Sequence, residues 1–366
     1  MKNPYNPSFG LRPERFLGRD LVINEIENAV EDVNSPWRST LLTGVRGSGK
    51  TAILSDLQRR FKEKNAIVVL TTPINGLLDD ILGQIHRQLP ESFVKKLPKI
   101  SGISTGLGVT LSVKNDEKIP SYTSTFRYQI TTLLEEAKKR NKRVIILIDE
   151  VQKHSSEMRI FVAIYQQLLM EGFGITLVLA GLPNAIRDIL NDEILTFFRR
   201  SMQLTLNYVD FPLVKQDYYE VFKSEYPGVS MEMINQMALD TRGYPYLIQL
   251  IGYYMWMKLR EEKDETRAYE SSMIHVMSAL HTNVHQLVYA ELSEADRSFL
   301  EAMAEDKEVS KVFDIAIRLG KSKGYVSRYR TRLIASGIVK PVGHGELAFA
   351  IPYMQEFILR SDYSVI

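Results

Sequence analysis

The sequence lacks several features that would narrow its chemistry. It contains no cysteine, which excludes disulfide bonds, thiolate catalysis and cysteine-ligated zinc. It also lacks a dominant charge, because 46 basic and 44 acidic residues leave a formal net charge of +2. A polyanion could therefore bind only at a local basic patch. The absence of cysteine fits a reducing compartment, and we predict a cytoplasmic location.

A long apolar run is also absent. The first 16 residues have no apolar stretch of the kind that a signal peptide needs. The longest uncharged candidate for a membrane span, residues 243–257, has 15 residues and contains Gln249 and four tyrosines. A span needs about 20 residues, so we expect a buried core helix here and predict no membrane partner.

The segment LLTGVRGSGKTAIL, residues 41–54, carries the strongest signal that is present. It has the G-x-x-x-x-G-K-T spacing of a P-loop, between a short apolar strand pattern and a helix pattern. Such a loop directs backbone N–H groups at phosphates, with Lys50 at the β- and γ-phosphates and Thr51 on Mg²⁺. The alternative is a glycine turn without a ligand. The predicted nucleotide contacts here are Gly44, Arg46, Gly47, Ser48, Gly49, Lys50, Thr51 and Ala52.

The segment RVIILIDE, residues 143–150, is the second strong signal. An apolar run ends in two carboxylates, and ligands of open α/β sheets bind at the carboxyl ends of the strands. We predict that Asp149 holds Mg²⁺ and that Glu150 orients and polarises the attacking water, since phosphoryl transfer needs both roles. The alternative is a strand followed by two solvated acids.

The order of the patterns predicts the fold class. A chain of 366 residues is long enough for two or three domains. Strand and helix patterns alternate from residue 39 to about 206, which predicts an α/β fold with a parallel sheet covered on both faces. Residues 210–288 are helical in pattern, and from 292 the order helix, helix, turn, helix and β-hairpin predicts a winged helix-turn-helix. Residues 101–124 predict a small hairpin or mobile insertion without an assigned role. The candidate strands are 39–43, 66–71, 144–148, 175–180 and 202–206.

Four segments together carry a family resemblance: FLGRD at 16–20, GVRGSGKT at 44–51, ILIDE at 146–150 and RGYPYL at 242–247. The chain resembles AAA+/STAND-type P-loop ATPases, and among them the archaeal-type and origin-recognition-like ATPases with a C-terminal winged helix. The resemblance covers nearly the whole chain. It implies a P-loop ATPase core at residues 1–208 with an AAA+-like parallel sheet, an all-helical lid at 209–290 and a winged-helix domain at 291–366.

The resemblance also implies nucleotide contacts outside the P-loop. Gly243 and Pro245 match a G-x-P element that lies near the nucleotide in the helical lid. The alternative is a plain helix start, which suits proline in the first turn. Phe16, Gly18 and Arg19 resemble a segment that packs near the adenine, and the alternative for Arg19 is a surface arginine.

Arg199 and Arg200 precede the last strand pattern of the core, in a position that resembles that of an arginine finger. A finger supplied by a neighbouring subunit stabilises transition-state charge, so this role requires self-association. The alternative is a pair of ordinary surface arginines.

One departure from the family concerns the strand at 175–180. It ends in Ala180 and Gly181, where AAA+ ATPases usually have a polar sensor, and Asn184 is the nearest polar substitute. We therefore predict slow intrinsic turnover.

The C-terminal region contains a basic segment. Between residues 318 and 340 there are seven basic residues and no acid. On a helix, Val326, Tyr329 and Leu333 would form an inward apolar stripe and leave basic side chains on another face, as a groove-binding helix requires. The alternative is a solvated helix in a module that binds protein. The predicted DNA contacts are Lys321, Lys323, Tyr325, Arg328 and Arg332.

These patterns predict an ATPase that uses ATP/ADP and Mg²⁺ and whose lid and winged helix change position with the nucleotide. Such a switch works if ATP and ADP bind the two arrangements with different affinity. The first hypothesis places the switch on duplex DNA. The second is a STAND-like signalling or scaffold ATPase whose tail binds protein, and the third is a nucleotide-binding module with little turnover.

Overall fold

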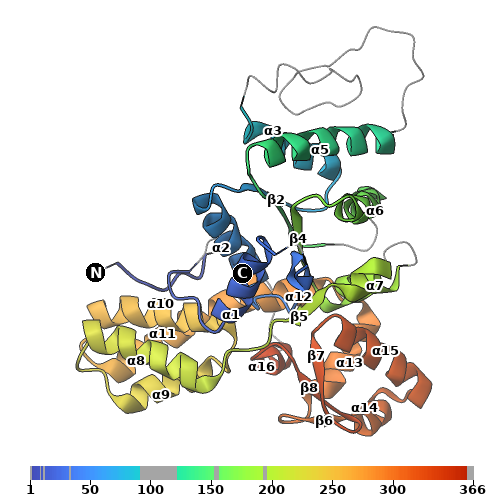
Figure 1. The fold of residues 1–366 in the computed structure, drawn as a ribbon. Helices are drawn as coiled ribbons and strands as arrows, with labels where there is room; N and C mark the ends of the chain where they lie inside the picture. Colours follow the sequence, from blue (N-terminus) through green and yellow to red (C-terminus); the bar gives the residue numbers. More distant parts are fainter. Residues whose placement is uncertain are drawn as a thin grey trace.

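The chain folds into an α/β core followed by a mainly helical C-terminal half (Figure 1). The computed structural model describes residues 2–8, 10, 13–32, 34–90, 122–151, 156–192 and 196–360. The segment 101–124, for which we predicted a hairpin or insertion, lies outside the described residues except for the start of α5 (Tyr122–Lys139).

Five parallel strands form the central sheet, in the order β2-β3-β4-β1-β5. Their bounds agree with the predicted strands to within one residue at each end, which confirms the predicted α/β fold class. Strand β4 lies between the P-loop strand β1 and the acidic strand β3. The strands are β1 (Ser39–Thr43), β2 (Ile67–Thr71), β3 (Val144–Ile148), β4 (Ile175–Gly181) and β5 (Met202–Thr205).

Both faces of the sheet are buried, which explains why its central strands are continuously apolar. Successive residues of a strand point to opposite faces, so Ile145 packs in one apolar cluster and Ile146 in the other. The first cluster includes α1 (Asp20–Ala29) and α2 (Lys50–Glu63), and the second includes α3 (Leu77–Arg87), α5, α6 (Ser156–Met170) and α7 (Pro183–Asn191).

The outer edge of β2 is closed by two glutamine side chains of α3. Gln88 accepts from the N–H of Val68 at 3.0 Å and donates to its carbonyl at 2.9 Å. Gln84 does the same for Leu70, at 3.2 and 3.0 Å. Because the open backbone groups of an edge strand invite pairing with another chain, these side chains protect the sheet from such pairing.

The C-terminal half consists of helices and one small antiparallel sheet. Between residues 211 and 290, all of which the structure describes, there are helices and no strand. We call α8 to α12 the lid helices: α8 (Phe211–Glu225), α9 (Met231–Asp240), α10 (Pro245–Glu261), α11 (Glu265–Leu280), the π-helix η3 (His281–His285) and α12 (Gln286–Ala290).

After the lid helices come three helices and a hairpin. The hairpin turns at His344 and Gly345, and its second strand also pairs with a short preceding strand. We call these elements the C-terminal unit: α13 (Glu294–Ala304), β6 (Ser310–Lys311), α14 (Val312–Leu319), α15 (Lys323–Ala335), β7 (Val339–Gly343), β8 (Glu346–Phe349) and α16 (Met354–Leu359).

None of the described helices is both long enough and apolar enough to cross a membrane. Residues 243–257 lie mostly in α10, whose Leu247, Leu250 and Ile251 are buried. The expectation of a buried core helix is confirmed for this segment.

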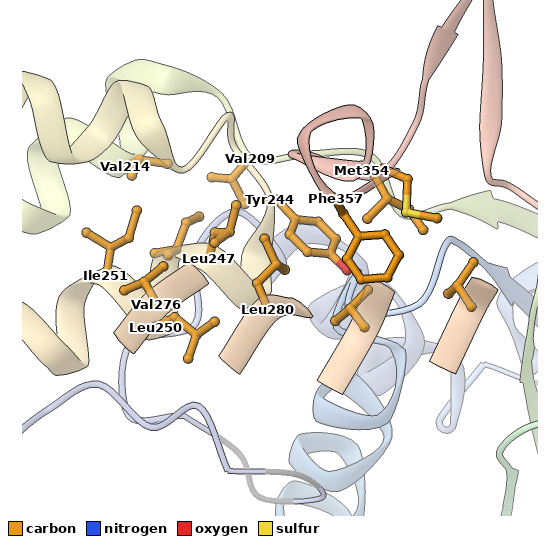
Figure 2. Close-up of a cluster of buried hydrophobic side chains, with 14 of the residues drawn as sticks. Val209, Val214, Tyr244, Leu247, Leu250, Ile251, Val276, Leu280, Met354 and Phe357 are labelled. Atoms are coloured by element: carbon orange, nitrogen blue, oxygen red, sulfur yellow. The ribbon is translucent and has the colours of Figure 1, made fainter. Parts of the chain in front are cut away.

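One apolar cluster joins the lid helices to the C-terminal unit. Figure 2 shows part of it, in which Leu280 of the lid belongs to the same cluster as Met354 and Phe357 of α16. The N-terminal segment belongs to it as well, because Tyr5 is buried there and its hydroxyl donates to Asp217 of α8 at 2.9 Å. Packing thus crosses the boundaries predicted near residues 208 and 290, which stay predictions.

Candidate nucleotide-binding site

The loop between β1 and α2 turns tightly at its glycines. Gly47 (φ +75°) and Gly49 (φ +93°) adopt left-handed conformations that favour glycine. A Cβ atom on Gly44 would lie 2.4 Å from Ser48 Oγ, and one on Gly47 would lie 2.2 Å from the Tyr244 hydroxyl. The glycines of the predicted P-loop therefore also make room for close contacts within the loop and with the lid.

Lys50, the first residue of α2, points back into this loop. Its ammonium group donates to the carbonyls of Gly44 (2.8 Å) and Val45 (3.0 Å). Burial lowers the pKa of Lys50 to about 8, while the nearby carboxylates of Asp149 and Glu150 oppose that shift. The structure thus brings the predicted lysine and both predicted acids together.

Thr51 and Asp149 meet at the carboxyl edge of the sheet. The Thr51 hydroxyl donates to Asp149 Oδ2 at 2.6 Å, although 98 residues separate the two in sequence. Asp149 is 7% exposed, and its Oδ1 accepts from the N–H of Glu150 at 2.9 Å. Two oxygen ligands of the kind that Mg²⁺ prefers therefore lie side by side.

Glu150 has an unusual backbone conformation. Its φ of +52° lies in the left-handed region, which costs a non-glycine residue on the order of 1 kcal/mol. Its side chain is exposed at the end of β3. Strained residues of this kind cluster at functional sites, which supports a role beyond that of a solvated acid.

The residues present fit a polyphosphate and a magnesium ion. Ser48 Oγ is buried in the loop without a hydrogen-bond partner among the described residues, and such a group is costly unless a ligand or water satisfies it. The narrow glycine loop, the Lys50 ammonium and the start of α2 form an anion site around it. Thr51 and Asp149 supply hard oxygen donors for the cation.

Phe16 lies beside the P-loop, and Arg19 is buried against the backbone of a distant segment. A Phe16 ring carbon would lie 3.7 Å from a Cβ placed on Gly49, so this ring borders the P-loop. Arg19 is 8% exposed and donates to the Asn207 carbonyl at 2.5 Å, so the alternative of a surface arginine is wrong. Gly18 (φ +68°) precedes it. Contact of these residues with an adenine stays a prediction.

Gly243 and Pro245 flank Tyr244 at the start of α10. Gly243 has φ +69°, and a Cβ there would lie 2.3 Å from the Val209 carbonyl. Pro245 is the first residue of α10. Between them, the Tyr244 hydroxyl donates to the Arg46 carbonyl at 2.5 Å. The predicted G-x-P element is therefore a helix start that also contacts the P-loop. Sequence reasoning missed Tyr244, whose one signal was its place between two predicted residues.

Arg199 and Arg200 are exposed on the 3₁₀ helix η2 (Thr196–Arg200). Arg199 Nε donates to the Leu190 carbonyl at 3.0 Å. The described residues show no hydrogen bond from either arginine to the P-loop of the same chain. Action of these arginines on a neighbouring subunit stays a prediction.

Gly181 ends β4 at the position where a polar sensor was expected. A Cβ there would lie 2.6 Å from Val151, so the position is tightly packed. Asn184, the suggested substitute, is exposed, and its side chain accepts from the N–H of Ala185 at 2.9 Å. The carboxyl end of β4, which the structure describes in full, contributes no polar side chain to the site.

The predicted DNA contacts lie on α15 and just before it. Lys321, Lys323 and Arg328 are exposed, and Tyr325 is partly exposed. The inward stripe is confirmed for two of its three positions, since Val326 and Leu333 are buried and Tyr329 is half-buried.

Arg332 differs from the other predicted DNA contacts. Its guanidinium donates to the buried carboxylate of Asp296 and, at 2.9 Å, to Ser293 Oγ. Both partners belong to the capping box at the start of α13. A phosphate would have to compete with this ion pair, so Arg332 also has a structural role.

The fold and this site define a class of protein. A loop lysine and a Thr–Asp pair at the carboxyl edge of a parallel sheet form the arrangement of a P-loop nucleotide-binding domain. Residues 15–169 match the family described as AAA ATPase domain. This match covers less than half of the chain and supports an AAA+-type ATP-binding domain in that part. Residues 282–358 match a domain of unknown function (DUF8462).

Two similar curated proteins are uncharacterised ATP-binding proteins of Methanocaldococcus jannaschii. They are 29% identical over 152 residues and 25% identical over 164 residues. Each match covers 38% of this chain, and the matches span 40% and 44% of the relatives' own length.

Similar solved structures cover almost the whole chain. The Walker-type ATPase of Pyrococcus abyssi is 14% identical with a TM-score of 0.67, covering 95% of this chain and 97% of that one. The ORC2 protein of Aeropyrum pernix, in ADPNP–ADP complexes, is 11% identical with a TM-score of 0.62, covering 96% of each chain. Cdc6p of Pyrobaculum aerophilum is 16% identical with a TM-score of 0.50, also covering 96% of each. The chain thus has the fold of an archaeal origin-recognition-like AAA+ ATPase, as the resemblance implied.

Proposed function

We propose that this chain is a Mg²⁺-dependent ATPase that turns over slowly and acts as a nucleotide switch, associated with duplex DNA through a C-terminal winged helix. The observation that carries the proposal is the meeting of Lys50, Thr51 and Asp149 at one edge of the sheet. Burying an ammonium group and a carboxylate is costly, and the packing of the sheet does not require it. Their presence supports ligand chemistry at this edge.

Each residue of the site has a separate role in phosphoryl transfer. Lys50 contacts the β- and γ-phosphates, and the N–H groups at the start of α2 hold the same oxygens. Thr51 and Asp149 would hold Mg²⁺, and the ion would neutralise part of the negative charge on the phosphates. Glu150 orients the attacking water and accepts its proton.

The end of β4 supports slow turnover. Among the described residues, Gly181 and the closely packed Val151 supply no side-chain donor there for the transferring phosphate. One positioned donor contributes about 10²–10³-fold in rate in enzymes where it has been removed. We therefore expect turnover well below that of AAA+ motors.

The lowered pKa of Lys50 predicts that nucleotide binding depends on pH. The pKa of Lys50 is about 8 in the free site, and bound phosphates favour the charged form, so binding above pH 8 must take up a proton. Affinity for ADP should therefore fall as the pH rises, by up to about tenfold per pH unit. The measurement is calorimetric titration from pH 7 to 9.5, in buffers of different ionisation enthalpy.

Lys50→Arg is the control for this dependence, because arginine keeps its charge throughout that range. It should bind ADP more weakly than the wild type but with a flat pH profile. An equally flat profile for the wild type would remove Lys50 as the group that titrates.

Association with DNA is supported by the order and charge of the C-terminal unit. Helix α15 follows α14 after a short turn and precedes the β7–β8 hairpin, which is the order of a winged helix-turn-helix with α15 as the groove-facing helix. The side chains of Lys321, Lys323 and Arg328 are exposed, which supports phosphate contacts at this surface. Such contacts weaken steeply with salt.

The test is ATP turnover with and without duplex DNA at about 50 and 200 mM salt, with Glu150→Gln as the blank. We expect DNA to stimulate turnover and the stimulation to fade at the higher salt. Arg328→Ala should weaken DNA binding at every sequence and reduce the salt slope by about one. Arg267→Ala, at an exposed arginine of lid helix α11, is the matched control and should change neither quantity.

Turnover that is indifferent to DNA at both salt concentrations would contradict the DNA-associated form of the proposal. The C-terminal unit would then be a protein-docking module, and assembly in the presence of ATP, measured by light scattering, would test that alternative. Absence of turnover together with tight ADP binding would identify a nucleotide-binding module.

A further inference from the structure

Two residues of the P-loop, Val45 and Arg46, are contacted from outside the ATPase core. The Tyr244 hydroxyl of the lid donates to the Arg46 carbonyl, and the Arg46 side chain pairs with Glu291 at 3.1 Å. A Cβ on Gly337 of the C-terminal unit would lie 2.9 Å from Val45 Cγ1, so that unit reaches the loop as well. The exposed Arg46–Glu291 ion pair contributes little to the stability of this contact. Of these contacts, the hydrogen bond from the buried Tyr244 side chain has the best-defined geometry.

The Tyr244 hydrogen bond sets the orientation of one peptide group. In a planar trans peptide the carbonyl and the following N–H point in opposite directions, so the Arg46 carbonyl and the Gly47 N–H are opposed. Tyr244 holds the carbonyl toward the lid. The Gly47 N–H then faces the other way, and in the part of the chain that the structure describes it donates to no backbone acceptor. It is one of the N–H groups that the P-loop pattern assigns to phosphate.

The Tyr244 ring is closely packed on all sides. It is fully buried, it packs edge to face on Tyr208 with ring centroids 5.6 Å apart, and it belongs to the cluster of Figure 2. Its backbone is fixed between the left-handed Gly243 and the ring of Pro245. A donor held in this way can restrain the loop, because it cannot follow the Arg46 carbonyl if the peptide rotates.

We propose that Tyr244 is a positioning residue for the phosphate site: its hydroxyl holds the Arg46 carbonyl so that the Gly47 N–H is aimed at the phosphates of the nucleotide. The inference rests on the proposed nucleotide binding and adds the group through which the lid acts on it. Because coupling is reciprocal, a bound phosphate that fixes the Gly47 N–H also favours the contact between lid and core.

The test compares two tyrosine-to-phenylalanine variants in the full chain. Tyr244→Phe removes the hydroxyl that holds Arg46, and we expect ADP affinity to fall about three- to tenfold, the effect of one net hydrogen bond. Tyr208→Phe is the matched control, since the Tyr208 hydroxyl is buried without a partner among the described residues. It should bind ADP like the wild type.

Adenosine separates positioning from general damage to the site. It has no phosphates, so its affinity, measured by ligand-observed NMR, should be equal in the wild type and Tyr244→Phe. The inference is overturned if Tyr244→Phe binds ADP as tightly as Tyr208→Phe, or if it loses ADP and adenosine affinity equally. A wild-type chain that binds no ADP would overturn the proposed function itself, which makes the two failures distinguishable.

Discussion

Glu150→Gln is expected to leave ATP binding intact and to lower turnover by about 10²–10⁴-fold, the usual contribution of a positioned general base. Glutamine has the shape of glutamate but cannot accept the proton of the attacking water. The backbone N–H of residue 150, which donates to Asp149 Oδ1, is retained in the variant. The Asp149 carboxylate should therefore keep its place, so that the variant loses hydrolysis without losing ATP binding.

The measurement for Glu150 is single-turnover hydrolysis together with ATP affinity. Glu135→Gln removes an exposed carboxylate from α5, away from the P-loop, and should change neither quantity. Hydrolysis by Glu150→Gln at the wild-type rate would remove Glu150 from the role of base. A parallel loss of ATP affinity would instead show that its charge serves binding.

Lys50→Ala is expected to weaken nucleotide binding by about 30- to 5,000-fold, since removing one partner of a buried charge interaction costs about 2–5 kcal/mol. The free protein should lose little stability. Burial of the ammonium already opposes its charged form, as the lowered pKa of Lys50 indicates. This cost offsets the two hydrogen bonds to loop carbonyls and the attraction to Asp149 and Glu150 that the variant loses.

Thermal unfolding with and without ADP checks this expectation. A ligand that binds the folded state raises its stability by RT ln(1 + [L]/Kd). At an ADP concentration about tenfold above the wild-type Kd, the wild type should therefore shift upward and Lys50→Ala should shift far less. Lys62→Ala, at an exposed lysine on the same helix α2, should shift like the wild type. An undiminished shift in Lys50→Ala would place the nucleotide elsewhere.

The strands and the P-loop could be predicted from local pattern. A strand buried on both faces must be apolar at every position, so β3 and β4 were recognisable as short apolar runs. The left-handed turns at Gly47 and Gly49 admit few residues other than glycine, which is why their spacing is informative. These features depend on residues close together in the chain.

Other features depended on packing between distant segments. Arg19 could not be recognised as buried, because its partner is the backbone carbonyl of Asn207, and any residue supplies a carbonyl. The ion pair of Arg332 was equally hard to predict, since Asp296 is one of many acids outside the basic segment. Local spacing predicts which face of a helix or strand a side chain occupies, but not which residue it contacts there.

The sequence was enough to predict the α/β class, the strand bounds to within one residue, the P-loop pattern and the pair of acids after β3, because each depends on short-range periodicity or spacing. The tertiary structure alone decided that the Tyr244 hydroxyl reaches the Arg46 carbonyl, 198 residues away. That contact leaves no local pattern, because it arises where the lid packs on the core, and folding of the whole chain brings the two segments together.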